Sequence, residues 1–396
     1  MTIEVFGITG TNGKTTVSYM LKSILEEAGR ECGLIGTITH VIGQKQYDAL
    51  NTTPSGEVLE KYFHEMEQQH IGTCIMEVSS HGLDQGRVDN IDIHYSGFTN
   101  LTRDHLDYHV TMDNYFNAKA KLFYKTKKGM CINIDDVYGK RLYDKMKQEQ
   151  SEGGLDPDVK VESISFMEKN ADYFGKLLEN SIHGIVLEPF EAGASWGTIK
   201  IELPGRTTAY NGLLALSMAR QAGMDKEVII EGLRKLKGVP GRFQKVENSR
   251  GIDAVIDFAH TPDALENLLK TAGELHEGRL ICVFGCGGNR DREKRSMMGK
   301  IAGNNSDLCI ITSDNPRFEE PALITEEIEK GIVETACEYV IEIDRREAIR
   351  KAVARYQQGD LIVIAGKGHE KYQLVNGKKL PFDDYMTVQE IINMRE

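Results

Sequence analysis

The sequence predicts an α/β protein of two domains, each built on a mainly parallel sheet. Its 396 residues are enough for two or three domains and exclude a single small module. Short β-branched runs alternate with helical stretches from residue 3 onward, which is typical of parallel strands joined by crossover helices. A second alternation of the same kind follows a VPGR turn at 239–242. We therefore expect domains at residues 1–239 and 240–396, the second with a doubly wound sheet.

In the first domain, the run IEVFGIT at 3–9 predicts a strand, and a polar loop containing glycine follows it at 10–14. Apolar residues then recur at helical spacing from Val17 to Ala28, and Gly29 stands where a helix C-terminus favours glycine. Helical stretches separate the further strands that we expect at 73–78, 95–100 and 129–134.

The pattern changes between residues 150 and 200 to polar loops and short alternating runs. These runs predict an antiparallel extension of the first sheet, with strands at 159–166, 184–187 and 198–203. Helices at 209–222 and 226–236 then lead to the VPGR turn. In the second domain the expected strands lie at 253–258, 279–285, 307–312, 339–343 and 360–365.

Composition and charge narrow the classes of function. The chain is 40% hydrophobic and 27% charged, as in ordinary globular proteins. A net charge of −12 argues against nucleic acid or an anionic membrane as a partner, so we expect small-molecule substrates. No apolar run approaches the ~18 residues of a membrane span, and residues 1–9 lack a signal-peptide pattern, so a cytoplasmic protein is expected. The 7 cysteines show no CxxC spacing and are expected to be reduced core thiols.

The string GTNGKTT joins the first strand to the first helix. Glycines let backbone N–H groups approach phosphate oxygens, the helix N-terminus adds partial positive charge, Lys14 adds a point charge, and the Thr15 hydroxyl can ligate Mg²⁺. The strict GxxxxGK[ST] pattern is not met because position 8 is Ile, and an ordinary glycine-rich turn is the alternative. We predict an ATP-binding P-loop made by Gly10, Thr11, Asn12, Gly13, Lys14, Thr15 and Thr16.

A lysine lies on the apolar face of the helix predicted at 111–123. Lys119 is three or four residues from Tyr115, Phe116, Leu122 and Phe123, whereas Lys121 points away. Burial of an ammonium is costly, so Lys119 is expected to be paired, shifted in pKa or modified. A lysine that snorkels from the edge of the stripe is the alternative.

Two polar loops carry donors suited to a carboxylate or a phosphorylated acceptor. The first contains Thr52 and Thr53, and the second, EVSSHGLDQGRV, contains Ser79 and Arg87. Ordinary solvated loops remain the alternative interpretation.

Three loops after strands of the second domain carry charged groups that suit an amino acid. CGGNRDREKRSMMG supplies Arg290, AGKGHEKYQ supplies Glu370, and the proline of SDNPRFEEP ends a strand and leaves Arg317 in a loop. Arginines can grip a carboxylate and a carboxylate can receive an ammonium, which together make a receptor for a zwitterionic end. Because three strand ends converge at one edge of a doubly wound sheet, we favour this interpretation over an arginine-rich surface turn.

Together these motifs resemble the Mur ligases, a family of ATP-dependent carboxylate–amine ligases of cell-wall assembly. The resemblance extends from residue 10 to residue 373, and the DNPR form is similar to the members that add meso-diaminopimelate. It implies a central P-loop ATPase domain with a parallel sheet, followed by a C-terminal Rossmann-like domain that binds the amino acid. It also implies a cytoplasmic enzyme of peptidoglycan biosynthesis.

The resemblance implies roles for individual residues. The nucleotide would also contact Asn211, Arg242, Asp257 and His260. Magnesium would be held by Thr15, Glu77, His105 and a CO₂-derived carbamate on Lys119, and Lys14, Glu77, His105 and Lys119 would serve catalysis. The acceptor would contact Thr52, Thr53, Ser79 and Arg87. The amino acid would contact Arg290, Asp314, Asn315, Arg317, Gly366 and Glu370. The chain departs from the family pattern at Gln244, Phe258 and Asn289, where the family usually has Glu, Tyr and Asp.

The expected reaction phosphorylates the acceptor carboxylate with ATP, after which the amine attacks and expels phosphate. Diaminopimelate-adding relatives carry a further N-terminal domain that holds uridine diphosphate, whereas only nine residues precede Gly10. We therefore expect a chain without that domain, which leaves three interpretations. In the first, the protein uses the muramoyl dipeptide, and the nucleotide part of that acceptor is held weakly or by a partner that supplies the domain. In the second, it joins a different, non-UDP carboxylate to an amino acid. In the third, it binds ATP without ligase turnover.

Overall fold

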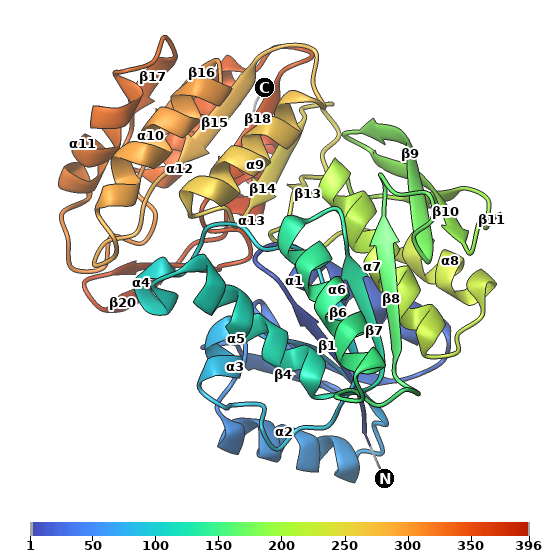
Figure 1. The fold of residues 1–396 in the computed structure, drawn as a ribbon. Helices are drawn as coiled ribbons and strands as arrows, with labels where there is room; N and C mark the ends of the chain where they lie inside the picture. The colour runs from blue at the N-terminus through green and yellow to red at the C-terminus, as the bar shows by residue number, and fades with distance from the viewer. Residues whose placement is uncertain (1–2, 395–396) are drawn as a thin grey trace. The chain divides into compact units, whose positions relative to one another are not determined.

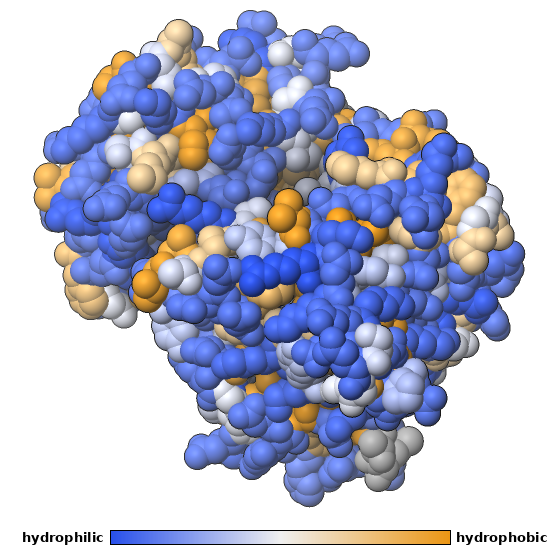
Figure 2. Space-filling model, viewed as in Figure 1, coloured by the Kyte–Doolittle hydropathy of each residue, from blue (hydrophilic) through white to orange (hydrophobic). Residues whose placement is uncertain are grey.

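The structure, a computed structural model, describes residues 3–394. The chain divides after Lys237 into two compact units, and each is described by itself. No described helix is long and apolar enough to cross a membrane. On the face shown in Figure 2, hydrophobic residues lie singly or in small groups among hydrophilic ones.

The first unit is built on one large sheet with the strand order β11-β10-β9-β8-β7-β6-β1-β5-β2-β3-β4, and β12 pairs with β10. Its centre is parallel, because β1 pairs in parallel with both β5 and β6. The strands are β1 (Glu4–Thr9), β2 (Cys32–Ile35), β3 (Thr39–Ile42), β4 (Lys45–Asp48), β5 (Thr73–Glu77), β6 (Ile93–Phe98), β7 (Thr126–Asn133), β8 (Lys160–Ser165), β9 (Tyr173–Ser181), β10 (Gly184–Glu191), β11 (Ala194–Ser195) and β12 (Ile199–Ile201).

Helices cover both faces of this sheet (Figure 1). Val5 belongs to a core cluster with residues of α2, α5 and α6, while Phe6 and Ile8, which point to the opposite face, are also fully buried. Helix α1 contacts β1, β2 and β5, and it packs against α7 and α8. The helices are α1 (Lys14–Glu27), α2 (Gly56–Gln68), α3 (Ser80–Asp84), α4 (Leu106–His109), α5 (Met112–Tyr124), α6 (Val137–Ser151), α7 (Arg206–Gln221) and α8 (Lys226–Lys235).

The second unit has a mainly parallel sheet in the order β13-β14-β18-β15-β16-β17 and a separate hairpin, β19-β20. Its core strands are fully buried aliphatic runs such as LIVIA in β18, as expected for parallel strands covered on both faces. The strands are β13 (Gln244–Lys245), β14 (Ala254–Asp257), β15 (Leu280–Phe284), β16 (Leu308–Ile311), β17 (Glu338–Ile341), β18 (Leu361–Ala365), β19 (Tyr372–Val375) and β20 (Lys378–Pro381). The helices are α9 (Pro262–Gly273), α10 (Glu293–Asn305), α11 (Pro321–Ile332), α12 (Arg345–Arg355) and α13 (Asp384–Met394).

The predicted fold class is confirmed, with one correction in the first sheet. Residues 159–166 were expected to extend the sheet antiparallel, but β8 pairs in parallel with β7. The physical reason is that α6 connects β7 to β8 as a crossover helix, which returns the chain in the same direction. The antiparallel part begins later, where β10 pairs with β9 and β12. All seven cysteines are free thiols, as expected, and all but Cys337 are buried.

Candidate active site

The loop between β1 and α1 is held in place by residues 99 and 100, which follow strand β6. The side chain of Asn100 accepts a hydrogen bond from the Asn12 backbone N–H at 3.0 Å, and its backbone carbonyl accepts one from Thr11 N–H at 2.8 Å. Thr99 donates its hydroxyl to the Asn12 carbonyl at 2.6 Å. These contacts hold the loop between β1 and α1 against the segment that follows β6.

Two glycines of this loop are required by backbone conformation and space. Gly10 and Gly13 have φ of 145° and 90°, a region that other residues rarely adopt. A Cβ at Gly10 would lie 1.8 Å from Thr99 Oγ1, and one at Gly13 would lie 2.4 Å from Asn211 Oδ1. The predicted nucleotide residue Asn211, on α7, therefore lies directly against the predicted phosphate loop.

Around Glu77, the last residue of β5, hydroxyl groups gather. Its Oε2 accepts hydrogen bonds from Thr15 Oγ1 at 3.0 Å and from Thr37 Oγ1 at 2.8 Å, and its Oε1 accepts one from Thr37 N–H at 3.1 Å. Lys14 donates to the loop's own carbonyls, to Gly10 O at 2.9 Å and Thr11 O at 2.8 Å. The structure thus brings together two predicted metal ligands, Thr15 and Glu77, beside the loop lysine.

Lys119 on α5 points into the protein, as its place on the apolar stripe predicted. Only 1% of the residue is exposed, and its Nζ donates to Gly10 O at 2.8 Å and lies 4.7 Å from the centre of the Tyr115 ring. No carboxylate of the described residues forms an ion pair with it. Burial, with a further contribution from the nearby Lys14 cation, lowers the pKa of Lys119 well below its usual range, against the opposing effect of Asp104. Lys121 instead pairs with Asp84 at the surface.

His105 lies in a group of aromatic rings rather than in a cluster of metal ligands. Its ring is 4.9 Å from that of His81 and 6.0 Å from that of Tyr115, and its Nε2 is 3.4 Å from Asp104. Partial burial lowers the pKa of His105, which favours the neutral imidazole that can bind a metal. In residues 3–394 no three His, Cys, Asp or Glu side chains are arranged to hold a metal ion. A hard cation bound near His105 would therefore need oxygen ligands other than the unmodified side chains around it.

The four predicted acceptor residues come together through hydrogen bonds. Thr53 Oγ1 accepts from Ser79 N–H at 2.9 Å and donates to the Glu77 carbonyl at 3.0 Å. Arg87 Nη1 donates to Thr53 O at 2.7 Å. Thr52 Oγ1 lies 3.1 Å from the hydroxyl of Thr37, the residue that also contacts Glu77. The predicted acceptor loop is thus directly linked to the candidate metal-binding group.

In the second unit, the predicted nucleotide residues surround Phe258. The Arg242 guanidinium lies 5.3 Å from the centre of the Phe258 ring, and the His260 and His369 rings lie 4.6 Å and 5.0 Å from it. The Asp257 carboxylate accepts the backbone N–H groups of Phe243 at 2.7 Å and Ala259 at 2.8 Å. Burial is the main cause that lowers the pKa of His369 to about 4, with help from Arg242.

Loops after β15, β16 and β18 meet, as the strand order requires. Asn315 Nδ2 donates to Glu370 Oε2 at 2.8 Å, and Arg317 Nη1 donates to Gly288 O at 2.9 Å. The Asp314 carboxylate is buried, and a Cβ at Gly366 would lie 2.6 Å from its Oδ2. Arg290 remains exposed on the first of these loops.

Several residues that sequence reasoning did not single out contribute to these groups. Thr37, Thr99 and Asn100 shape the phosphate loop and Glu77, but isolated polar residues after strands give no signal of their own. Lys367 was detectable, since it lies in the same GKGHE string as Glu370, and the structure places it between Asn315 and Glu370.

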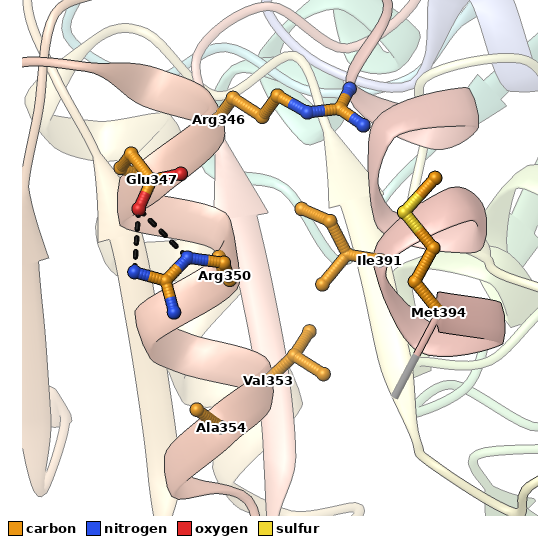
Figure 3. A pocket seen from close by; sticks show the side chains of 7 residues that line it. All are labelled: Arg346, Glu347, Arg350, Val353, Ala354, Ile391 and Met394. Carbon is orange, nitrogen blue, oxygen red and sulfur yellow. Dashed lines mark hydrogen bonds and ion pairs between the residues drawn. The ribbon is translucent and has the colours of Figure 1, made fainter. Parts of the chain in front are cut away.

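A surface cavity of about 260 Å³ lies between α12 and α13 (Figure 3). Arg350 is hydrogen-bonded to Glu347 along one helix, while Ile391 and Met394 face them from the other. No predicted site residue lines this cavity. The candidate site therefore consists of the loops described above, and the cavity between α12 and α13 is not part of it.

Comparison with known proteins gives consistent matches over the chain. Residues 8–219 match the family described as Mur ligase middle domain, and residues 241–368 match the one described as Mur ligase, glutamate ligase domain. A protein of Alkaliphilus oremlandii named UDP-N-acetylmuramoyl-L-alanyl-D-glutamate--2,6-diaminopimelate ligase is 44% identical over 391 residues, which cover 98% of this chain and 78% of that protein. The protein of the same name from Clostridium botulinum is 42% identical over 394 residues with the same coverage. A solved structure of a ligase of this name has a TM-score of 0.72 and 36% identity, and the match covers 99% of this chain and 79% of that one.

Proposed function

The chain belongs to the Mur ligase family, whose members form amide bonds at the expense of ATP, and we propose that it adds meso-diaminopimelate to a muramoyl-L-alanyl-D-glutamate acceptor. The two relatives reported above are named as ligases of UDP-N-acetylmuramoyl-L-alanyl-D-glutamate and 2,6-diaminopimelate. The observation that carries the proposal is the meeting of the loops after β15, β16 and β18. There Asn315 contacts Glu370, and Arg317 contacts the loop after β15.

The amino-acid receptor suits a zwitterionic end of the substrate. A guanidinium such as that of Arg317 or Arg290 can bind a carboxylate through two hydrogen bonds, and Glu370 can receive an ammonium. Asn315, which contacts Glu370, and Asp314 and Gly366, which lie against each other, are the further proposed contacts. Lysine lacks the second zwitterionic end that diaminopimelate offers, so we propose that these residues select diaminopimelate.

The nucleotide phosphates are proposed to bind at the loop from Gly10 to Thr16. This loop precedes the N-terminus of α1, whose backbone N–H groups and dipole favour an anion. Lys14 now donates to two loop carbonyls, and a bound phosphate would give its ammonium a stronger acceptor. Arg242, Asp257 and His260 remain proposed contacts of the nucleotide.

The residues near Glu77 fit Mg²⁺ on condition that Lys119 carries a carbamate. Thr15 and Glu77 offer hard oxygen ligands, whereas an unmodified Lys119 offers none. The low pKa of Lys119 favours the neutral amine, which is the form that reacts with CO₂ to give a carbamate. We propose that Thr15, Glu77, His105 and this carbamate hold the metal, which would neutralise phosphate charge when bound.

The proposed reaction has two steps that balance without a redox partner. An acceptor carboxylate oxygen attacks the γ-phosphorus of ATP, which releases ADP and forms an acyl phosphate. The amine nitrogen of diaminopimelate then attacks the carbonyl carbon, loses a proton and expels phosphate. Thr52, Thr53, Ser79 and Arg87 are proposed to orient the acceptor, while Lys14 stabilises charge on the transferred phosphoryl group.

The proposal is tested with purified protein, Mg-ATP, a panel of acceptors and a panel of amino acids, followed by phosphate release and product mass. We expect release only when the muramoyl dipeptide and meso-diaminopimelate are both present. Release with an acceptor of a different kind, or with lysine preferred over diaminopimelate, would contradict the proposed substrates. Release with no pair would contradict ligase activity.

The same assay tests the role of uridine diphosphate. Acceptors with and without the nucleotide are compared, and stimulation by an added cell extract would support a partner that binds it. Because ATP and nucleotide-linked precursors are cytoplasmic metabolites, we propose the cytoplasm as the site of the reaction.

A further inference from the structure

Lys367 is a buried cation in the middle of the proposed amino-acid receptor. It lies in the loop after β18, its side chain is 0% exposed, and its Nζ donates to Asn315 Oδ1 at 3.2 Å and to Glu370 Oε2 at 3.0 Å. A buried ammonium is tolerated when a carboxylate and further hydrogen bonds compensate its lost hydration. Among residues 3–394, Asn315 and Glu370 accept hydrogen bonds from Lys367, and the centre of the Tyr372 ring lies 5.8 Å from its Nζ.

These contacts close a triangle between two loops. Asn315 follows β16 and Glu370 follows β18, so 55 residues of chain separate them, yet Asn315 Nδ2 donates to Glu370 Oε2 at 2.8 Å. Leu374 N–H also donates to Asn315 Oδ1 at 2.8 Å, which fixes the orientation of the amide. With its amide so oriented, Asn315 presents its oxygen to Lys367 and its nitrogen to Glu370.

The two carboxylate oxygens of Glu370 differ in their hydrogen bonds. Oε2 accepts hydrogen bonds from both Lys367 and Asn315. No described residue donates a hydrogen bond to Oε1, and the Glu370 side chain is 23% exposed. Oε2 is thus anchored, and Oε1 is the oxygen of this partly exposed side chain that is left to receive a substrate ammonium.

We propose that Lys367 is a positioning residue for the amino-acid substrate, because it anchors Oε2 of Glu370 and so leaves Oε1 for the incoming ammonium. This inference rests on the proposed function, since it assigns the amine-binding role to Glu370. Lys367 itself does not touch the substrate. It acts through Glu370, and it keeps the Asn315–Glu370 geometry formed before the amino acid arrives.

A double-mutant cycle tests whether Lys367 acts through Glu370. Wild type, Lys367→Met, Glu370→Gln and the double variant are assayed for KM and kcat with Mg-ATP, acceptor and meso-diaminopimelate. We expect Lys367→Met to raise KM for the amino acid about tenfold or more, the effect of losing one charge-assisted contact, with KM for ATP unchanged. In the Glu370→Gln background the same substitution is expected to have little further effect.

Two controls separate positioning from a general loss of structure. Lys371→Met, four residues along the same loop and exposed, is expected to leave both constants unchanged. Thermal unfolding is measured for every variant, and a midpoint above the assay temperature identifies a variant that is folded during the assay. Lys367→Met with unchanged KM for the amino acid would overturn the inference, as would an equal loss in both backgrounds.

The wild-type arm distinguishes failure of the inference from failure of the proposed function. If wild type uses another amino acid in place of meso-diaminopimelate, the proposed substrate is wrong and the cycle is run with the amino acid that it uses. If wild type turns over meso-diaminopimelate and the cycle is additive, only the role of Lys367 is overturned.

Discussion

The buried Lys119 is the feature that distinguishes this site from an ordinary nucleotide-binding loop. Lys119 is fully buried, contacts the Gly10 carbonyl, and has no carboxylate partner among the described residues. A buried ammonium in such surroundings is unstable as an unmodified cation, whereas a carbamate there would bring a negative charge beside the phosphate loop at Gly10. Burial without a carboxylate partner is costly for an unmodified Lys119, and the proposed reaction uses Lys119 in its carbamate form.

Substitution of Lys119 tests this role. Lys119→Ala is expected to lower kcat about 100-fold or more, the order of effect seen when one preorganised electrostatic group is removed from an active site. The measurement is ADP and phosphate release under saturating substrates. Lys121→Ala, which removes an exposed lysine two residues away, is the control and is expected to keep wild-type activity. Full activity of Lys119→Ala would contradict its assignment to the metal site.

Thr37 is a second residue whose role is open to measurement. Its hydroxyl donates to Glu77 Oε2 at 2.8 Å, so Thr37→Val removes one donor while it keeps a β-branched side chain. Residues that orient a metal ligand typically change metal affinity 10- to 100-fold. We expect Thr37→Val to raise the Mg²⁺ concentration for half-maximal activity about tenfold, measured by Mg²⁺ titration at saturating ATP.

Thr39→Val is the matched control, because the Thr39 hydroxyl donates to the Tyr47 carbonyl and not to Glu77. Equal Mg²⁺ dependence of the Thr37 and Thr39 variants would show that Glu77 does not depend on Thr37.

At the scale of elements, helices α12 and α13 are joined by two ion pairs in different surroundings. Arg345 and Asp384 are 0% exposed, and Arg345 also donates to Ala365 O at 3.1 Å, at the end of β18. Arg346, the residue after Arg345, pairs with Glu390 of α13, and their side chains are 44% and 46% exposed. The buried pair thus ties both helices to the strand that leads into the Lys367 loop.

These two pairs are expected to differ in stability. Asp384→Ala leaves the Arg345 charge buried and is expected to lower the free energy of unfolding by about 3–5 kcal/mol. Glu390→Ala breaks an exposed pair and is expected to cost about 0–1 kcal/mol. Urea unfolding measures both. Similar costs for the two variants would contradict the structural role given to the buried pair.

The elements that sequence could predict are those with a strong internal pattern. The buried strands β5 and β18 give continuous, mostly apolar runs. Helix α5 gives an amphipathic stripe, which placed Lys119 on the apolar face of that helix. The strands β2, β3 and β4 were missed because each has only 4 residues, and β4 is in addition mostly exposed without apolar alternation. Direction is not encoded in a single strand, so β8 was assigned to the antiparallel part although α6 makes it parallel to β7.

The candidate site was predictable to the extent that its residues lie in dense local motifs. The residues of GTNGKTT and those on each loop of the amino-acid receptor were found in this way. Contacts between distant segments were not, for example Thr37 with Glu77, 40 residues apart, or Lys367 with Asn315, 52 residues apart. Such pairs depend on the order of strands in the sheet, which the local sequence does not state.

For the molecule as a whole, buried histidines make stability sensitive to acid. Burial lowers the pKa of His40, which accepts a hydrogen bond from Gly36 N–H, and of His94, which accepts one from Val5 N–H. For His369 the pKa falls from 6.5 to about 4. Between these two values the unfolded chain binds more protons than the folded one, so stability falls as pH falls.

His369→Gln isolates one of these groups. The stability that neutral His369 gives is fully present above pH 6.5 and is lost as pH falls toward 4. Between about pH 7 and pH 4.5, we expect the free energy of unfolding to fall less for the variant than for wild type, because only wild type has a histidine that must take up a proton in this range. Urea unfolding at several pH values measures the difference. Parallel pH profiles of the two proteins would contradict the shifted pKa.

One measurement tests the central claim, that this chain makes an amide bond through an acyl phosphate. The acceptor is labelled with ¹⁸O in its reacting carboxylate and incubated with wild-type protein, Mg-ATP and meso-diaminopimelate, and mass spectrometry is applied to the products. We expect a new amide of acceptor and diaminopimelate and one ¹⁸O atom in the released phosphate, because the carboxylate oxygen that attacks ATP leaves with the phosphoryl group. Unlabelled phosphate, or phosphate release without the amide product, would contradict it.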